Sequence, residues 1–358
     1  MDKMNILAIN PGSTSTKIAV FHNDKSVFLK TIRHSAEDLD KYEKIADQFE
    51  FRKDVILKEL IDADICIDQL TAIVGRGGLI KPVEGGVYEV NQRMKEDLEN
   101  VIMGEHASNL GGLIALNIAE SLNNVRAFIA NPVVVDELQD VARISGHPEF
   151  ERMSIFHALN HKAIAHQFAK SRDVKYENMN LIVAHLGGGV SVGAHYHGKV
   201  IDVNNALDGD GPFSPERTGG LPSGQLAALC FSGKYTHAEI KKMITGKGGL
   251  MGYFGTNSSY EIEQKAKDGD EQANLIQDAM AYQIGKAIGE MATVLNGEVH
   301  GILITGGVAN NKELITYIRN MVGFIAPVFV YPGEDEMSAL AMNGLLVLRG
   351  EIECKEYL

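Results

Sequence analysis

Short apolar runs and glycine-rich polar segments alternate along this chain. Near the N-terminus, an apolar run at 5–9 is followed by the polar segment NPGSTSTK at 10–17 and then by apolar runs at 18–21 and 26–31, with a turn between them. Three such runs are typical of an antiparallel meander. The segment at 10–17 is longer than a hairpin turn requires and places hydroxyls beside one lysine, which indicates a binding role.

The same pattern returns in the second half of the chain, although few residues are identical. An apolar run at 180–185 is followed by the segment LGGGVS at 186–191, and apolar runs at 192–197 and 200–203 come after it. Self-similarity of this kind indicates an internal duplication, so we expect two halves of similar structure.

Each predicted meander continues into strands and helices. The expected elements are helices at 41–62, 108–122, 224–232 and 271–295 and strands at 71–75, 125–130 and 301–305. Strands that alternate with helices after a meander predict a mixed sheet covered on both faces. The expected fold is therefore α/β, with two domains and a cleft between them.

Composition agrees with a globular protein of two domains. The chain has 358 residues, of which 45% are hydrophobic and 23% charged, and this length exceeds what a typical single core accommodates. A formal net charge of −13 argues against nucleic acid or an anionic membrane as a partner. The three cysteines lie far apart, which excludes a local disulfide framework or CxxC metal site.

The N-terminal residues lack the pattern of a signal peptide, and no apolar run reaches the length of a membrane span, about 18 residues. We therefore expect a cytoplasmic protein.

Glycine-rich segments follow several predicted strands, and neither standard phosphate motif fits them. A Walker loop requires Ser or Thr after Gly-Lys, but Tyr235 follows Gly233-Lys234 and Gly248 follows Gly246-Lys247. A dinucleotide fingerprint fails because Val192 replaces the third glycine and a strand follows. The remaining possibility is a β-hairpin that presents backbone N–H groups, hydroxyls and one lysine to a phosphate, once in each half.

Four segments carry a specific resemblance, and together they span almost the whole chain. They are NPGSTSTK at 10–17, FHALNHKA at 156–163, HLGGGVSVGAH at 185–195 and TGGVANN at 305–311. With these segments, the chain resembles the acetokinase family of the acetate and sugar kinase, Hsp70 and actin superfamily, and within that family its butyrate kinases. The resemblance implies two RNase H-like domains: an acyl- and phosphate-binding domain at 1–155 plus 340–358, and a nucleotide-binding domain at 156–339.

The resemblance also implies an activity: transfer of a phosphoryl group from ATP, with Mg²⁺, to a short-chain carboxylic acid such as butyrate. Acetate, propionate and branched acids remain alternatives, as do a sugar or polyol kinase and an ATP-switched scaffold. The family further implies a homo-oligomer.

Site residues carry over from the family one by one. The implied catalytic residues are Arg76, Asp136, His157 and Arg217, and the implied substrate-binding residues are Arg76 and His106. The implied ATP-binding residues are Asn10, Gly12, Ser13, Thr14, Lys17, His185, Gly187, Gly188, Gly189, Gly306, Gly307 and Asn311. The implied metal ligands are Asn10, Asp136, Asp335 and Glu336.

Simpler roles compete with several of these assignments. Asp136 suits a helix N-cap, Asn311 suits another, and acidic residues such as Asp335 are common at helix starts. Arg76 can be a surface residue beside a turn. His157 and His161 share a helix face, but a zinc site would need a third ligand that the motif lacks.

Overall fold

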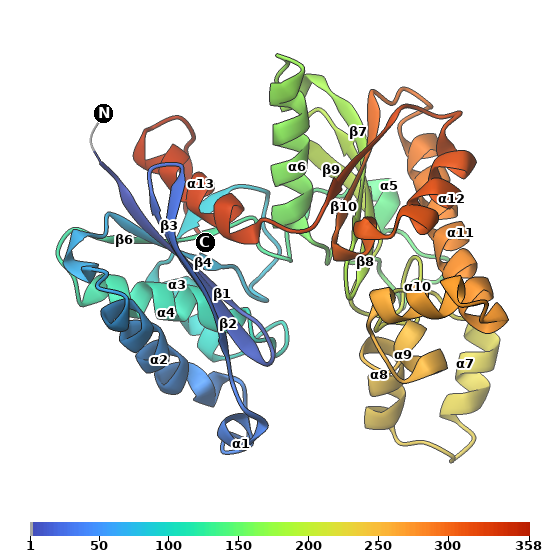
Figure 1. The fold of residues 1–358 in the computed structure, drawn as a ribbon, viewed down its shortest axis with the longest axis horizontal. Helices are drawn as coiled ribbons and strands as arrows, with labels where there is room; N and C mark the ends of the chain where they lie inside the picture. Colours follow the sequence, from blue (N-terminus) through green and yellow to red (C-terminus); the bar gives the residue numbers. More distant parts are fainter. Residues whose placement is uncertain (1–2) are drawn as a thin grey trace. The chain divides into compact units, whose positions relative to one another are not determined.

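The computed structural model describes residues 3–358 and consists of two compact units (Figure 1). One unit comprises Met1–Val135 and Asp335–Leu358, and the other comprises Asp136–Glu334. The boundaries expected at 155 and 340 need correction, because residues 136–155 pack with the second unit. Gln139 N donates to Ile201 O at 3.0 Å, and Ala206 N donates to Ile155 O at 2.9 Å.

The first unit is built on a seven-stranded mixed sheet with the order β12-β5-β6-β4-β1-β2-β3. Its strands are β1 Asn5–Pro11, β2 Ser15–His22, β3 Lys25–Arg33, β4 Ala72–Arg76, β5 Val87–Glu89, β6 Arg126–Ala130 and β12 Cys354–Lys355. Its helices are α1 Ala36–Leu39, α2 Phe49–Asp62, α3 Gln92–Glu99, α4 Asn109–Glu120 and α13 Glu336–Leu348. The predicted three-stranded meander is confirmed as β1–β2–β3, which pair antiparallel.

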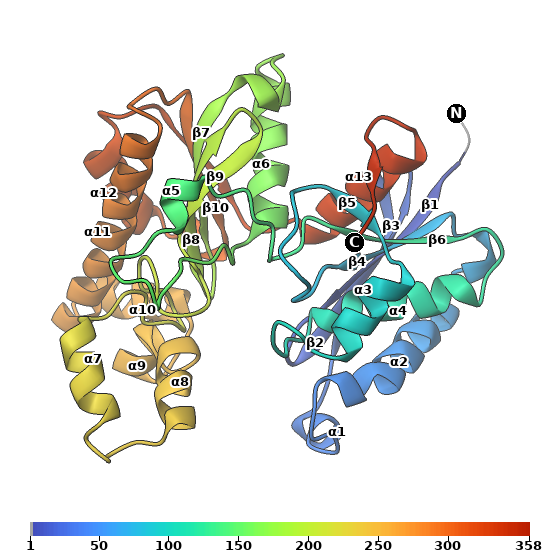
Figure 2. The ribbon, with the colours of Figure 1, turned by 180° about the vertical axis from the view of Figure 1, so that it is seen from behind.

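Helices cover both faces of this sheet, as Figures 1 and 2 show. On one face, alternate residues of β1 such as Leu7 and Ile9 join a core with α2 and α4. On the other face α13 packs so closely that a Cβ added at Gly344 would lie 2.5 Å from Val74 Cγ2. The returning C-terminal segment is therefore an integral part of the first unit.

The second unit is built on a five-stranded sheet with the order β11-β10-β7-β8-β9. Its strands are β7 Asn180–Leu186, β8 Val190–Tyr196, β9 Lys199–Val203, β10 Gly301–Gly306 and β11 Val328–Pro332. Its helices are α5 Asp140–Arg143, α6 Ala158–Ser171, α7 Ser223–Cys230, α8 His237–Thr245, α9 Gly249–Phe254, α10 Ser259–Lys267, α11 Glu271–Val294 and α12 Lys312–Val322. Leu181 and Val183 of β7 pack against α6, whereas Ile182 and Ala184 pack on the α11 side.

The predicted duplication is confirmed at the level of topology. The order β3-β2-β1-β4-β6 in the first sheet corresponds to β9-β8-β7-β10-β11 in the second. Both meanders also shift register at the same place, between Val20 and Phe21 in β2 and between Ala194 and His195 in β8. The α/β fold with two helix-flanked mixed sheets is thus as expected.

None of the helices within residues 3–358 combines the length and apolar character needed to cross a membrane.

Candidate active site

The segment between β1 and β2 is held by a buried arginine that the sequence did not single out. Arg52 of α2 is 1% exposed and donates through Nη1 to Gly12 O at 2.7 Å and through Nη2 to Ser13 O at 3.0 Å. The carbonyl of Thr14 accepts from His34 N at 2.9 Å. The N–H groups of Ser13 and Thr14 meet no acceptor in the described chain. The Gly12 amide donates to Ser15 O at 2.7 Å. With these carbonyls engaged and the amides of Ser13 and Thr14 unpaired, this hairpin has the character of an anion site.

Burial perturbs the groups behind the hairpin. Arg52 has a pKa lowered to about 10, because burial penalises its charge. His34, whose Nε2 lies 2.9 Å from Thr16 Oγ1, has a pKa lowered to about 4, first by burial and then by the charge of Arg52. His34 is therefore neutral at neutral pH.

Three predicted site residues from distant parts of the sequence meet in the first unit. Asn10 is the next-to-last residue of β1, Arg76 ends the adjacent parallel strand β4, and Glu336 begins α13. Asn10 Nδ2 donates to Glu336 Oε2, and Arg76 Nη1 lies 2.9 Å from Glu336 Oε1 and 3.3 Å from Asn10 Oδ1. The hydrogen bonds and the ion pair of Arg76 use Nη1, and Nε and Nη2 make no hydrogen bond within residues 3–358.

The other candidates in the first unit have different surroundings. Lys17 pairs directly opposite Asn10 in the β1–β2 ladder, so both side chains lie on one face of the hairpin. Asp335 is the N-cap of α13, and its Oδ1 accepts from Ser338 N at 3.1 Å, so the capping alternative applies to it. His106 Nδ1 accepts from Ser108 N at 3.2 Å, before α4 begins.

In the second unit, the glycine loop between β7 and β8 lies against a buried guanidinium. A Cβ added at Gly189 would lie 2.0 Å from Arg217 Nη1, so only glycine leaves room for this arginine. Arg217 Nη1 donates to Ala206 O, its Nε is buried without a partner, and it forms no ion pair within residues 3–358. Burial lowers the pKa of Arg217, although the neighbouring Glu216 opposes this effect. A buried guanidinium without a carboxylate is suited to an anionic ligand.

The remaining loop residues are held mainly by the main chain. Ser214 Oγ donates to Gly188 O at 2.6 Å, and Gly187 N donates to Gly189 O at 3.0 Å. His185, at the end of β7, is 1% exposed, and its Nε2 lies 3.3 Å from Glu334 Oε1.

The segment after β10 combines a required glycine with a helix cap. Gly306 has φ +95°, and a Cβ there would lie 2.3 Å from Leu186 O, whereas a Cβ at Gly307 would meet nothing within 4 Å. Asn311 is the N-cap of α12 and accepts from Leu314 N at 3.0 Å, while its Nδ2 donates to Gln277 Oε1 at 2.8 Å. The capping role that competed with ATP binding is therefore present at Asn311.

Asp136 has a local role different from the expected helix cap. The N-cap of α5 is Gln139, so the capping interpretation of Asp136 was wrong. Instead, Asp136 Oδ1 accepts from Leu138 N at 3.2 Å, and Oδ2 accepts from Arg143 Nη1 at 2.5 Å. Its carboxylate is thus already neutralised within the second unit.

His157 and His161 contact the same hydroxyl, which agrees with the expected shared face. His157 is the N-cap residue of α6, and its Nδ1 lies 2.9 Å from Ser191 Oγ, while His161 Nε2 lies 2.8 Å from the same atom. The ring of His157 stacks on that of His185 with centroids 4.1 Å apart. His161 is fully buried, and burial lowers its pKa well below the usual value, with His185 contributing.

Oxygen donors for a metal are present without a dedicated cage. Within residues 3–358, no group of three His, Cys, Asp or Glu side chains forms a metal-binding cluster. Mg²⁺ usually takes one or two carboxylates and completes its shell with waters and phosphates. Glu336 and the amide oxygen of Asn10 are a donor set that fits this chemistry.

Comparison with known proteins places the chain in a family. A family model described as Acetokinase family matches residues 151–324. Butyrate kinase 2 of Clostridium acetobutylicum is 57% identical over 355 residues, 99% of each chain, and butyrate kinase 1 of the same organism is 55% identical over 352 residues, 98% of this chain and 99% of that one. The chain belongs to the acetokinase family.

Solved structures agree with this membership at the level of the fold. An acetate kinase from Porphyromonas gingivalis matches with a TM-score of 0.78 at 19% identity, covering 96% of this chain and 100% of that one. A propionate kinase from Francisella tularensis matches with a TM-score of 0.77 at 19% identity, covering 95% and 98%. The acetokinase fold thus accounts for both sheets.

Proposed function

We propose that this acetokinase-family chain transfers the γ-phosphoryl group of ATP to a short-chain carboxylate, giving ADP and an acyl phosphate, and catalyses the reverse reaction. The observation that carries the proposal is the Arg76 guanidinium, which is fixed through Nη1 and whose Nε and Nη2 make no hydrogen bond within residues 3–358. Two parallel donors of this kind suit a carboxylate. Butyrate is the proposed substrate, since the relatives that are 55–57% identical are named butyrate kinases.

The chemistry of this transfer fits the charges of the site. A carboxylic acid is already ionised at neutral pH, so the reaction needs no strong general base. The obstacle is repulsion between two anions, which positioned cations and backbone N–H groups reduce. Arg76, Lys17 and Arg217 supply fixed positive charge, and the two hairpin loops supply the amides.

We assign each unit a part of the reaction. In the first unit, Arg76 and His106 bind the carboxylate, and Asn10, Gly12, Ser13, Thr14 and Lys17 bind the phosphoryl group. In the second unit, His157 and Arg217 contact that group, and the loops containing Gly187–Gly189, His185, Gly306, Gly307 and Asn311 bind the nucleotide. The cleft between the halves stays a prediction.

Mg²⁺ is the proposed metal, and Glu336 with Asn10 would hold it in the first unit. When bound, it would neutralise charge on the phosphate oxygens. Asp136 and Asp335 remain candidate ligands, but the first is paired with Arg143 and the second caps α13. Glu336 is itself paired with Arg76, so these contacts do not rank the three carboxylates.

A sugar or polyol kinase is the competing function, with Asp136 as the base that deprotonates a hydroxyl. The 2.5 Å contact between Asp136 and the Arg143 guanidinium weighs against it, because this carboxylate oxygen is already held by a partner within its own unit. Hydroxylamine trapping separates the two functions, since only an acyl phosphate yields a hydroxamate. A cytoplasmic location and a homo-oligomeric state complete the proposal.

Substitution of Arg76 tests the assignment. With MgATP and C2 to C5 acids, Arg76→Ala should lower kcat/KM for the acid by about 100-fold, as expected for two lost charge-assisted hydrogen bonds. Arg76→Lys should recover part of this loss, because it keeps the charge without the planar fork. Arg126→Ala removes an exposed arginine of the same sheet and should leave kcat/KM unchanged. Full activity in Arg76→Ala would show that the acid binds elsewhere.

A further inference from the structure

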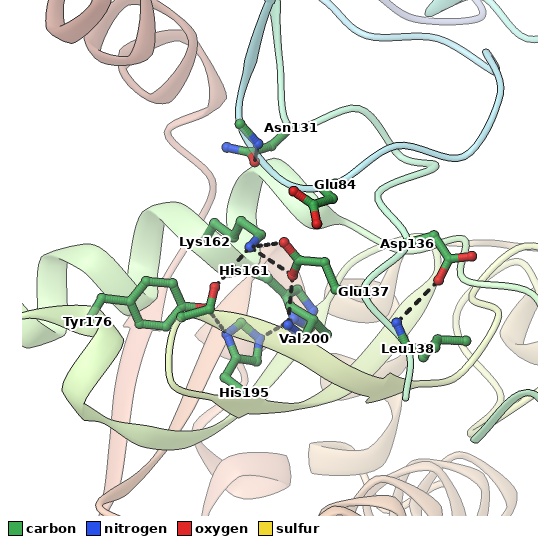
Figure 3. A network of polar contacts seen from close by, with 12 residues as sticks. Glu84, Asn131, Asp136, Glu137, Leu138, His161, Lys162, Tyr176, His195 and Val200 are labelled. Atoms are coloured by element: carbon green, nitrogen blue, oxygen red, sulfur yellow. Dashed lines mark hydrogen bonds and ion pairs between the residues drawn. The ribbon is translucent and has the colours of Figure 1, made fainter. Parts of the chain in front are cut away.

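A buried chain of hydrogen bonds leads from His157 into the interior of the second unit. Its steps are Tyr176 Oη to His195 Nδ1 at 2.7 Å, His195 Nε2 to His161 Nδ1 at 3.2 Å, His161 Nε2 to Ser191 Oγ at 2.8 Å and Ser191 Oγ to His157 Nδ1 at 2.9 Å. Tyr176 is 3% exposed, and Ser191, His161 and His195 are 0% exposed. Figure 3 shows Tyr176, His195 and His161 in succession.

Each buried group in this hydrogen-bond chain needs an acceptor for its proton. A neutral imidazole has one N–H donor and one acceptor nitrogen, and a hydroxyl donates one proton. His161 and His195 each use both ring nitrogens within the chain, so all the bonds must point in one direction. Either every group donates toward His157, or every group donates toward Tyr176.

The tyrosine decides between these two directions. Within residues 3–358, the Tyr176 hydroxyl has no hydrogen-bond partner other than His195. If His195 donated to it, the buried Tyr176 O–H would have no acceptor, which is costly in an interior. Tyr176 must therefore donate to His195 Nδ1. The remaining bonds follow in order, and Ser191 donates to Nδ1 of His157.

The charges around the chain keep it neutral. Burial, with Lys162 as a further cause, lowers the pKa of both His161 and His195 well below the usual value, and burial raises the pKa of Tyr176 well above 10. Lys162 is itself held by Glu137 at 2.9 Å, in an ion pair that is almost fully buried (Figure 3). A second positive charge beside Lys162 is disfavoured, so neither His161 nor His195 carries one.

We propose that Tyr176, His195, His161 and Ser191 are positioning residues that fix His157 as the tautomer with its proton on Nε2. Since Nδ1 of His157 accepts from Ser191, Nε2 is the nitrogen that donates outside the chain. His157 then acts as a neutral donor of fixed direction toward the transferred phosphoryl group, and this last part rests on the proposed function. Such an arrangement requires no reorganisation of the imidazole during the reaction.

The tautomer can be measured without any substrate. In the full chain labelled with ¹⁵N-histidine, nitrogens that carry a proton resonate far from those that carry a lone pair. We expect the His157 signals, identified by their loss in His157→Gln, to show a lone pair on Nδ1 and a proton on Nε2 at neutral pH. His161 and His195 should show the same tautomer. A proton on Nδ1 of neutral His157 would overturn the proposal.

Variants test whether this hydrogen-bond chain fixes the tautomer of His157. Ser191→Ala should give His157 as a mixture of tautomers and lower kcat about 10- to 100-fold, the loss found when the hydrogen-bond partner behind a functional histidine in metal sites is removed. The KM values should change less than kcat. Ser191→Thr, which keeps the hydroxyl, should restore the tautomer. An unchanged His157 spectrum in Ser191→Ala would contradict the proposal.

A pair of tyrosine variants provides the matched control. Tyr176→Phe removes only the first donor of the chain and should also mix the tautomers of His157, whereas Tyr196→Phe, at an exposed tyrosine, should not. If Ser191→Ala fails to fold, this pair and the wild-type spectrum decide. If the spectra are as expected but no hydroxamate forms, the proposed function is refuted, whereas the proposal about the hydrogen-bond chain and the His157 tautomer holds.

Discussion

At the residue scale, His34 makes the stability of the β1–β2 hairpin region depend on pH. Its pKa is lowered from 6.5 to about 4 in the folded chain, so the unfolded chain takes up a proton first as pH falls. The contribution of His34 to stability is complete above pH 6.5 and is lost as pH falls from 6.5 toward 4. The unfolding free energy should therefore decrease on acidification across this range.

His34→Gln isolates this effect in urea unfolding between pH 7 and 4. Its unfolding free energy should decrease less steeply with acidification than that of the wild type. The difference between the two slopes corresponds to at most one bound proton. His147→Gln, at an exposed histidine, should keep the wild-type slope. The other buried histidines are the same in the wild type and in both variants, so their contributions cancel when the slopes are compared. Equal slopes in His34→Gln and the wild type would contradict the assignment.

At the residue scale, sequence reasoning depended on motifs that are tied to particular residue types. It singled out Asn10, Arg76 and Glu336, which meet in the structure, but only through resemblance. It missed Arg52, because the partners of this arginine are carbonyls some 40 positions earlier in the chain and carbonyls leave no trace in residue type. It missed Tyr176 for a related reason, since the hydrogen-bond partner of its hydroxyl within residues 3–358 is His195, 19 positions away on β8.

At the scale of elements, the loop after β10 depends on one glycine. Gly306→Ala places a Cβ 2.3 Å from Leu186 O at φ +95°, so both sterics and backbone conformation oppose it. The free energy of unfolding should fall by about 3 kcal/mol. Gly307→Ala is the matched control, because its Cβ meets nothing within 4 Å, and it should stay within about 0.5 kcal/mol of the wild type.

Urea unfolding of these two variants measures the difference directly. A similar loss in both would mean that general loop flexibility, not the contact with Leu186, accounts for the glycine. A normal KM for ATP in Gly307→Ala would further show that the nucleotide-binding role proposed for Gly307 tolerates a methyl group.

The sequence predicted where strands form better than it predicted which sheet a segment packs on. The meanders could be predicted because burial on a sheet face forces apolar runs, and the polar segments between them mark the turns. The domain boundary at 155 was wrong because residues 136–155 contain almost no regular structure beyond the short α5, so no periodicity shows which sheet they pack on. Their attachment depends on individual main-chain bonds such as Gln139 N to Ile201 O.

At the scale of the molecule, the two similar units differ in whether one continuous segment of the chain forms them. The second unit is one continuous segment, Asp136–Glu334, with its own sheet and core. The first unit requires Asp335–Leu358 to return, because α13 packs on its sheet and supplies Glu336 to Arg76. The two units should therefore differ in whether they fold alone.

Expression of 136–334 and of 1–135 as separate chains tests this difference. The fragment 136–334 should be folded and should bind MgATP, because it retains the glycine loop and Arg217, but it should form no hydroxamate from butyrate. The fragment 1–135 should not fold cooperatively, since removal of α13 exposes one face of its sheet and leaves Arg76 without Glu336. Circular dichroism, urea unfolding and calorimetric titration with MgATP provide the measurements, with the full chain as control. A cooperatively folded 1–135 would mean that α13 is dispensable for the first unit, and nucleotide binding lost in a folded 136–334 would mean that the nucleotide site also needs residues of the first unit.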